Sequence, residues 1–259
     1  MNDPAGLLEH GEVVVDGRLV EASNATLLCR LVGGSGEARC VYKPVAGERP
    51  LWDFPDGTLA AREVAAYEVA EATGWHLVPP TVLRDGPFGP GMCQLWVEAT
   101  GEELVDVVGP AEVTDGWLPV LEAVDGEGRP VVLVHADDPR LRRMAVFDVV
   151  INNADRKGGH VVVDAGGSVL GVDHGVSFHV EDKLRTVLWG WRGAQLTEAE
   201  RDVLHGLRTG LHGALGERLT ALLAAEEVAA LGDRVGRLLA AGRLPAPDGR
   251  RRPIPWPPF

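Results

Sequence analysis

The fold is decided by one stretch of the chain, INNADRKGGHVVVDAGGSVLGVDHG (residues 151–175). Two apolar runs, HVVVD (160–164) and SVLGVD (168–173), are separated by a Gly-containing turn, and this pattern predicts a β-hairpin. One acidic residue, Asp155, precedes the hairpin, and another, Asp173, ends its second strand 18 residues later. The stretch therefore sets two carboxylates on either side of one hairpin.

The first part of the chain is predicted to be rich in β-strands. EVVVDGRLV (12–20) contains Asp16-Gly17 between two apolar runs, which is a hairpin signal. Residues 58–74 predict a helix, with Thr58 as its N-cap and Gly74 as its C-terminal stop. Further strands are predicted at 25–32, 38–44, 80–86 and 92–98.

The rest of the chain is predicted to be mainly helical. Asp138-Pro139 opens a helix over 140–150, which leads into the hairpin stretch. Thr197-Glu-Ala-Glu200 has the pattern of a capping box, and two or three amphipathic helices are expected from there to about residue 241. Residues 98–116, acidic and interrupted by Gly and Pro, are interpreted as a linker, and DGEGRP (125–130) predicts a hairpin turn.

This order of elements predicts an α+β protein in two lobes, a β-rich N-lobe with one helix and a mainly helical C-lobe. The N-lobe is expected over 1–97 and the C-lobe over 98–245. Residues 246–259 form a Pro-rich tail that is expected to be extended.

Composition and charge argue against several classes of protein. The chain has 259 residues, a net charge of -13 and a pI of about 5.0, which disfavour binding to nucleic acid. Cys29, Cys40 and Cys93 form no CxxC pair, so a disulfide framework or a zinc site is not expected. No signal-peptide pattern and no run of roughly 18 apolar residues is present, so we expect a cytoplasmic protein without integral membrane association.

Two residues of the N-lobe fit the needs of phosphoryl transfer, which depends on a cation for the phosphates, metal ions and a carboxylate near the acceptor hydroxyl. Lys43 ends an apolar strand in Cys40-Val-Tyr-Lys43, as the phosphate-binding lysine of kinases does. Glu63 lies about 40° from Leu59 on the helical wheel, inside the apolar stripe. A carboxylate buried there needs a cationic partner, and Lys43 is the natural candidate.

Two acidic residues of the hairpin stretch complete the pattern. Asp155 corresponds in place to the catalytic-loop aspartate of kinases, and His160 stands five residues later, where kinases have a metal-binding asparagine. Val172-Asp173-His-Gly175 has the Asp-x-Gly form and the location of the metal-binding DFG element. Each pattern is weak alone, but their order on the expected elements indicates a kinase-like site.

On these residues the chain resembles the phosphatidylinositol 3-/4-kinase superfamily, especially its type II phosphatidylinositol 4-kinase and HipA-like branches, and an uncharacterised bacterial group within it. The resemblance runs from about residue 20 to 195. Asn153-Ala-Asp155-Arg156 resembles the catalytic-loop core, Gln94-Leu-Trp-Val97 the hinge strand, and Leu184-Arg-Thr-Val-Leu-Trp189 the segment after the metal-binding aspartate. The resemblance implies a two-lobed protein-kinase-like fold.

The resemblance also implies an ATP-dependent kinase that requires Mg²⁺ or Mn²⁺. It would transfer the γ-phosphoryl group to a hydroxyl of a small molecule, a lipid headgroup or a protein Ser/Thr. Lys43, oriented by Glu63, would hold the α/β-phosphates, and Asp155 would act on the acceptor hydroxyl with Arg156 as a further catalytic residue. Asp173 would hold the metal.

Further residues receive roles from the same resemblance. Asn153 or His160 would help Asp173 to hold the metal. The hinge backbone would hold adenine at Gln94, Leu95, Trp96 and Val97. The phosphates would be covered from around Ser23 and Asn24, because no G-x-G-x-x-G loop occurs.

Two alternatives stay open. His160 in place of the usual asparagine favours a pseudokinase that binds nucleotide and regulates a partner, although Lys43, Asp155 and Asp173 are retained. The other is an enzyme that transfers a nucleotidyl group, because the pose of the substrate decides which group is transferred. A basic cluster, Lys183, Arg185 and Arg192, follows Asp173 together with Trp189 and Trp191. This cluster either attracts an anionic acceptor or is a charged surface loop whose tryptophans are anchored in the core. The acceptor and the oligomeric state stay open.

Overall fold

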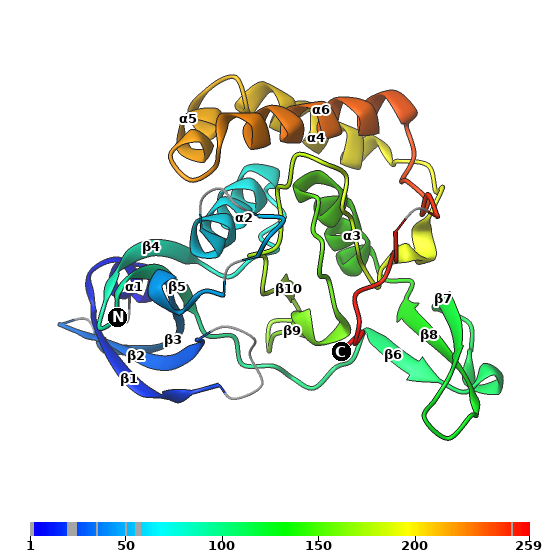
Figure 1. Ribbon diagram of the computed structural model, residues 1–259, viewed down its shortest axis with the longest axis horizontal. Coiled ribbons are helices and arrows are strands. Elements are labelled where there is room, and N and C mark those ends of the chain that lie inside the picture. Colours follow the sequence, from blue (N-terminus) through cyan, green and yellow to red (C-terminus); the bar gives the residue numbers. More distant parts are fainter. Residues whose placement is uncertain (1–2, 20–24, 35, 50, 55–57, 250) are drawn as a thin grey trace.

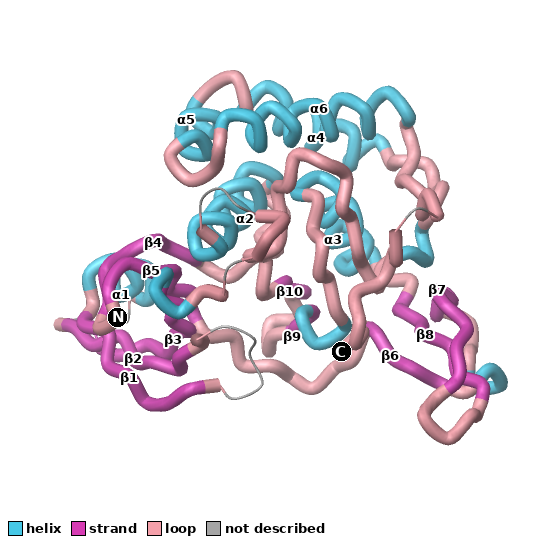
Figure 2. Tube along the Cα trace, in the orientation of Figure 1, coloured by secondary structure: helices cyan, strands magenta, loops and turns pink. Residues whose placement is uncertain are grey.

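The computed structural model describes residues 3–19, 25–34, 36–49, 51–54, 58–249 and 251–259. Its strands and helices are arranged in separate regions, with a five-stranded sheet at one side of the view and a layer of helices along the top (Figures 1 and 2). The α+β fold with a β-rich N-terminal region and a mainly helical C-terminal region is therefore confirmed. The boundary between lobes at residue 97 stays a prediction.

The N-terminal sheet is antiparallel, with strand order β1-β2-β3-β5-β4. Its core contains Leu31, Tyr42 and the three cysteines, all of which are buried. A short helix that the sequence reasoning missed, α1 (Pro4–His10), packs against this core through Leu7 and Leu8. The strands are β1 (Glu12–Arg18), β2 (Leu27–Gly33), β3 (Gly36–Pro44), β4 (Thr81–Gly86) and β5 (Gly89–Leu95).

The predicted hairpin turn at Asp16-Gly17 is wrong. β1 runs through both residues and pairs with β2 along its length, and the register shifts between Val15 and Gly17. The dipeptide forms a bulge there, which inserts one extra residue into a strand without ending it. Asp16 is held across the sheet by Arg30, whose Nε lies 3.0 Å from its Oδ1. This ion pair favours the continuous strand.

Helix α2 (Leu59–Thr73) is buried between the sheet and the C-terminal helices. Thr58 accepts a hydrogen bond from the Ala61 amide at 3.0 Å, and Gly74 ends the helix with φ +68°, as predicted. Alanine on several sides lets the neighbouring elements approach closely. Ala60 and Val64 pack toward Met92 on β5, whereas four residues pack into the main core: Ala65, Ala66, Val69 and Ala70.

A second antiparallel sheet lies at the other side of the molecule, with strand order β6-β8-β7 (Figure 1). Its strands are β6 (Val105–Val108), β7 (Trp117–Val124) and β8 (Pro130–Ala136). The interpretation of 98–116 as a linker is therefore wrong, because part of that segment pairs with β8. The predicted turn at 125–130 is confirmed, since it joins β7 to β8.

The helix and the hairpin around residues 151–175 fold as the sequence predicts. Helix α3 (Pro139–Ile151) starts at Asp138, whose carboxylate accepts from the Arg140 amide at 2.7 Å. It ends at Asn152, which has a positive φ of 55°. β9 (Val161–Val163) and β10 (Val169–Gly171) then form the predicted hairpin.

Three helices close the fold: α4 (Glu198–Gly210), α5 (Ala214–Thr220) and α6 (Ala225–Ala241). The predicted capping box at Thr197 is present. These helices lie over α2 and α3 in Figure 1, and a buried ion pair at 2.5 Å joins Arg62 of α2 to Glu227 of α6. Short 3-10 helices occur at Val45–Gly47, Pro110–Glu112, Gly158–His160 and Trp189–Trp191. Within the described residues, no helix combines the length and the apolar character needed to cross a membrane.

Candidate active site

Lys43 lies at the centre of the candidate site. Its Nζ donates to Glu63 Oε1 at 2.6 Å and to Asp173 Oδ1 at 2.8 Å, so β3, α2 and the loop after β10 meet at one ammonium group. Glu63 is 1% exposed, and its second oxygen accepts from the His174 amide at 2.8 Å. The ion pair expected from the helical wheel is therefore present.

The four residues singled out for phosphoryl transfer line one small cavity. Lys43, Glu63, Asp155 and Asp173 surround a space of about 50 Å³. Glu48 also lines it, and its carboxylate accepts from the first two amides of α2 at 2.9 and 2.8 Å. A carboxylate is stabilised at a helix N-terminus by those amides and by the helix dipole. The sequence reasoning did not single out Glu48.

The charges around Lys43 act on each other. Burial lowers the pKa of Lys43, but the carboxylates of Asp173 and Glu63 outweigh burial and raise it above its ordinary value. The positive charge of Lys43 in turn holds the pKa of Asp173 well below its usual range. Lys43 is therefore a fixed cation, and Asp173 a fixed anion, at neutral pH.

Asp155 lies on the loop that follows α3. Its amide donates to Asn153 Oδ1 at 3.0 Å, and its side chain is 32% exposed. Burial raises the pKa of Asp155, and the nearest cation, Lys157, is 3.9 Å away and opposes that shift. A carboxylate with a raised pKa is a better proton acceptor than an exposed aspartate.

Asp148 on α3 holds this loop from beneath, and the sequence reasoning missed it. Its buried carboxylate accepts from Arg156 at 3.0 Å, from Asn153 Nδ2 at 3.0 Å and from Thr186 Oγ1 at 3.3 Å. A buried charge needs this degree of pairing. One signal was available, because Asp148 interrupts the otherwise apolar end of the predicted helix.

Arg156 does not occupy the position expected of a catalytic residue. Its side chain is 0% exposed and is surrounded by Asp148, two carbonyl oxygens and His174, whose Nε2 is 2.7 Å from Nη2. The carbonyls belong to His160 and Val172, on the two sides of the β9–β10 hairpin. Arg156 therefore ties the Asp155 loop to the Asp173 loop from inside the protein.

The expected metal ligands are only partly brought together. Asp173 has a positive φ of 60°, its side chain is 51% exposed, and its Oδ2 lies 3.5 Å from His160 Nε2. Burial lowers the pKa of His160 to about 4, so its imidazole is neutral at pH 7. Asn153 is 0% exposed and bonded at both ends of its carboxamide, so it supports the loop and does not reach the cavity.

The described residues contain no group of three His, Cys, Asp or Glu side chains arranged to hold a metal ion. The pair of Asp173 and His160 still fits Mg²⁺. This ion usually takes one or two protein carboxylates and completes its shell with phosphate and water oxygens. Asp173 supplies such a carboxylate, and His160 supplies a neutral nitrogen beside it.

The hinge segment lies at the end of β5. Gln94 is buried, and its side chain donates to Thr81 Oγ1 at 2.8 Å. The amides of Leu95 and Trp96 donate to backbone carbonyls at 3.0 and 2.9 Å. Among the described residues, the amide of Val97 has no such partner. Ser23 and Asn24 lie outside the described residues.

A larger cavity, of about 1050 Å³, adjoins the small one, and Leu59 and Val176 line both. Asp155 lines both this cavity and the small one beside Lys43. Of the basic cluster, Lys183 and Arg185 line the larger cavity, whereas Arg192 does not. The larger cavity is also lined by the basic residues Arg49, Arg251 and Arg252.

The two tryptophans of the cluster are buried, with exposures of 7% for Trp189 and 6% for Trp191. Trp189 donates its indole N–H to the carbonyl of Pro253 at 2.8 Å, and Trp191 donates to Asp137 Oδ1 at 2.9 Å. The tryptophans therefore anchor the segment after Asp173 in the core. Of the three basic residues, Arg192 lies on the surface, whereas Lys183 and Arg185 line the larger cavity.

Comparison with known proteins gives one close relative in sequence. No family model matches the chain. The chain is 53% identical over 268 residues to Protein Rv2133c of Mycobacterium tuberculosis, across 100% of this chain and 96% of that protein. The crystal structure of a Helicobacter pylori proinflammatory kinase, CtkA, is similar at a TM-score of 0.46 and 10% sequence identity, over 90% of this chain and 93% of that one.

Proposed function

This chain belongs to the family of Protein Rv2133c, and we propose that it is an ATP- and divalent-metal-dependent phosphotransferase acting on an acceptor hydroxyl. One observation carries the proposal: Lys43, Glu63, Asp155 and Asp173 converge on a single cavity. They come from β3, from α2, and from the loops after α3 and β10. The ion pairs of Lys43 with Glu63 and Asp173 would not require a further carboxylate, Asp155, at the same cavity.

Lys43 would bind phosphate oxygens of the nucleotide. Glu63 is suited to orient it, because a buried carboxylate on a packed helix restricts the ammonium group to one place. Asp173 and His160 would hold the divalent ion, which supplies charge neutralisation on the β- and γ-phosphates when bound. Residues 94–97 would contact adenine through their backbone.

Asp155 would accept or orient the proton of the acceptor hydroxyl. Its raised pKa suits this role, and its position between the two cavities supports transfer from the Lys43 side to the larger side. Asn153, Asp148 and Arg156 would act as positioning residues, because they fix the loop without lining either cavity.

Nucleotide binding is tested by thermal unfolding with Mg-ATP and with Mn-ATP. A ligand at about 100 times its Kd adds ~2.7 kcal/mol to the free energy of unfolding if it binds the folded state alone. We expect Lys43→Met to lose the shift in Tm. Arg30→Met is the control, because Arg30 makes an exposed ion pair on the same sheet. An unchanged wild-type Tm with either metal at saturating ATP would refute the proposal.

A second pair of variants separates binding from chemistry. Asp155→Asn should retain the ATP-dependent shift in Tm but lose transfer, since Asp155 acts on the acceptor. Asp173→Asn should lose metal-dependent binding as well. Equal loss of the shift in both variants contradicts these separate roles.

A nucleotide-binding regulator without transfer is the second candidate. His160 in place of the metal-binding asparagine of kinases favours it, because a weakened metal site would impair transfer more than nucleotide binding. Mass spectrometry of the protein after incubation with ATP and metal, alone and with candidate acceptors, distinguishes the three candidate functions. Added phosphate supports the phosphotransferase, added AMP indicates nucleotidyl transfer, and no change together with a shift in Tm indicates the regulator.

A further inference from the structure

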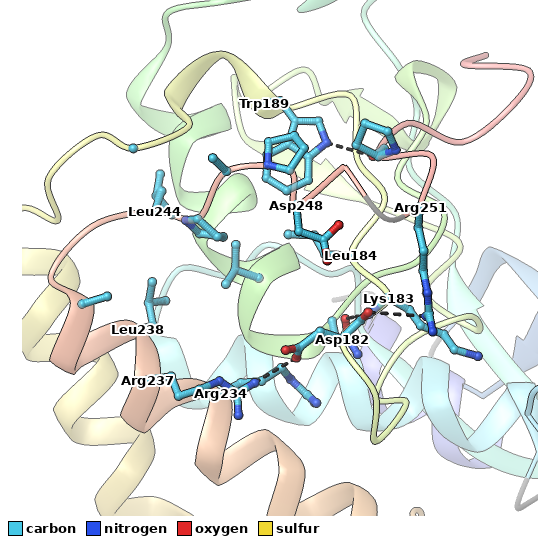
Figure 3. Close-up of a pocket in the computed structure, with 18 of the residues that line it drawn as sticks. Asp182, Lys183, Leu184, Trp189, Arg234, Arg237, Leu238, Leu244, Asp248 and Arg251 are labelled. Carbon is cyan, nitrogen blue, oxygen red and sulfur yellow. Dashed lines mark hydrogen bonds and ion pairs between the residues drawn. The ribbon is translucent and has the colours of Figure 1, made fainter.

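A third cavity, of about 550 Å³, lies between α6, the tail and the segment that contains Trp189 (Figure 3). None of its lining residues lines the small cavity around Lys43 and Asp173. Its size is within the range of roughly 300–1,000 Å³ that small-molecule sites occupy. The space is therefore separate from the nucleotide side of the proposed active site, whereas Lys183, Arg251 and Arg252 line both it and the larger cavity beside Asp155.

One wall of this cavity is apolar. Trp189 lies on one side of the cavity in Figure 3, and Leu244 and Leu184 line it as well. The wall is held in place by the tail, since the carbonyl of Pro253 accepts from both the Trp189 indole and the Thr186 amide, at 2.8 and 3.0 Å. A rigid wall of this kind suits the apolar body of a ligand.

The opposite side carries arginines of α6. Arg234 is 5% exposed, and its Nε and Nη1 donate to the carbonyls of Val150 and His179 at 3.1 and 3.0 Å. Its Nη2 has no hydrogen-bond partner among the residues that the structure describes. This Nη2 is also covered from solvent, so Arg234 contributes its positive charge to the cavity, and only a shift of its side chain would bring Nη2 to a bound anion.

The charge of the lining favours an anion. Six basic residues line the cavity: Lys183, Arg234, Arg237, Arg243, Arg251 and Arg252. Two acidic residues line it, Asp182 and Asp248. Three of the six basic residues already pair with carboxylates, Lys183 with Asp53, Arg237 with Asp182 and Arg251 with Glu181, so the positive excess comes from Arg234, Arg243 and Arg252. This excess of positive charge occurs in a chain whose net charge is -13, so it would concentrate anions at this place.

We propose that this cavity binds a small amphipathic anion, with its apolar body against Trp189 and Leu244 and its phosphate or carboxylate toward Arg234 and Arg237. The occupant would be a small molecule with one alkyl chain, because the half-open pocket has apolar residues on one side and arginines on the other. It would also contact the tail, whose end lies against the loop that carries Asp155. The proposal does not depend on phosphotransferase activity.

Isothermal titration calorimetry of the full chain with four probes tests the ligand class. Octyl phosphate should bind, whereas octanol, octyltrimethylammonium and inorganic phosphate should each bind at least about tenfold more weakly. Equal binding of octyltrimethylammonium would overturn the proposal, as would no binding of octyl phosphate. If the protein co-sediments with phosphatidylglycerol vesicles but does not bind octyl phosphate, the arginines contact a membrane surface. That result would also overturn the proposal.

Two matched pairs of variants locate the site. Ala241 and Ala240 are both exposed on α6, but Ala241 lines the cavity and Ala240 does not. Ala241→Trp should weaken octyl phosphate about tenfold, with Ala240→Trp close to wild type. Arg243→Gln should weaken it about threefold, whereas Arg143→Gln, on an exposed residue of α3 outside the cavity, should not. If Ala241→Trp binds octyl phosphate as tightly as wild type does, and circular dichroism shows both proteins folded, the ligand binds elsewhere. That result would refute the proposal.

Discussion

The ring of Phe259 lies directly against Gly158, three residues after Asp155, and leaves no room for a Cβ at that glycine. The Gly158 amide also donates to the carbonyl of Pro258 at 2.8 Å. The tail therefore contacts the loop of the proposed catalytic residue through both a side chain and the backbone.

A double-mutant cycle measures this contact. Gly158→Ala should lower the free energy of unfolding by roughly 1–3 kcal/mol, as overpacking does. In a Phe259→Ala background the same substitution should cost clearly less, because the ring is gone. Gly159→Ala is the control, since a Cβ there meets nothing within 4 Å, and should change stability by no more than about 0.5 kcal/mol. Urea unfolding gives the values, and strictly additive costs would contradict the contact.

The buried pair of Arg156 and Asp148 should be far more important for stability than an exposed pair. Arg156→Met leaves the Asp148 carboxylate buried without its main partner, and we expect a loss of about 3–5 kcal/mol. Arg129→Met removes an ion pair in which the arginine is 71% exposed, and about 0–1 kcal/mol should be lost. Similar losses in the two variants, measured by urea unfolding, would show that the Arg156 network does not hold the two loops together.

The proposed role of His160 predicts a change in metal preference. Imidazole suits later transition metals better than Mg²⁺, which prefers oxygen ligands. His160→Asn should therefore lower the ratio of Mn²⁺-supported to Mg²⁺-supported transfer. His76→Asn is the control, because His76 is exposed and lines neither active-site cavity. If the ratio stays constant while Tm falls, His160 serves packing and not the metal.

The raised pKa of Asp155 predicts a pH-dependent gain in stability on its removal. A carboxyl whose pKa is raised in the folded state disfavours folding once it ionises, starting near its ordinary value of 3.8 and reaching the full effect above the raised value. Asn does not titrate, so the stability of Asp155→Asn relative to wild type should increase between pH 4 and pH 7. Denaturant unfolding at both pH values measures this, with the exposed Asp202→Asn as control. A gain that shrinks as the pH rises would contradict the burial of Asp155.

Patterns that depend on neighbouring residues were predictable from the sequence. Thr58, Gly74, Asp138 and Thr197 mark helix ends because caps act within one turn. The β9–β10 hairpin follows from two apolar runs and a turn. Glu63 could be paired with Lys43 because a carboxylate in a buried stripe requires a cation.

Features that depend on distant segments were not predictable in this way. Asp148 gathers partners from the loop after α3 and from Thr186, and no local pattern indicates such a set. The contact of Phe259 with Gly158 joins residues about a hundred positions apart. At Asp16-Gly17 the local signal was misleading, because pairing with β2 continues on both sides of the bulge, which depends on a segment the local pattern does not contain.

The bond between Lys43 and Asp173 has a consequence for how the two proposed ligands would bind. Each residue neutralises the charge of the other, so a phosphate on Lys43 would weaken its hold on Asp173, and a metal on Asp173 would weaken its hold on Lys43. Whichever ligand arrives first releases the partner residue for the second. Reciprocity requires that metal and nucleotide then raise each other's affinity by the same factor. The ion pair would thus make the site respond cooperatively to the metal–nucleotide complex and only weakly to either component alone.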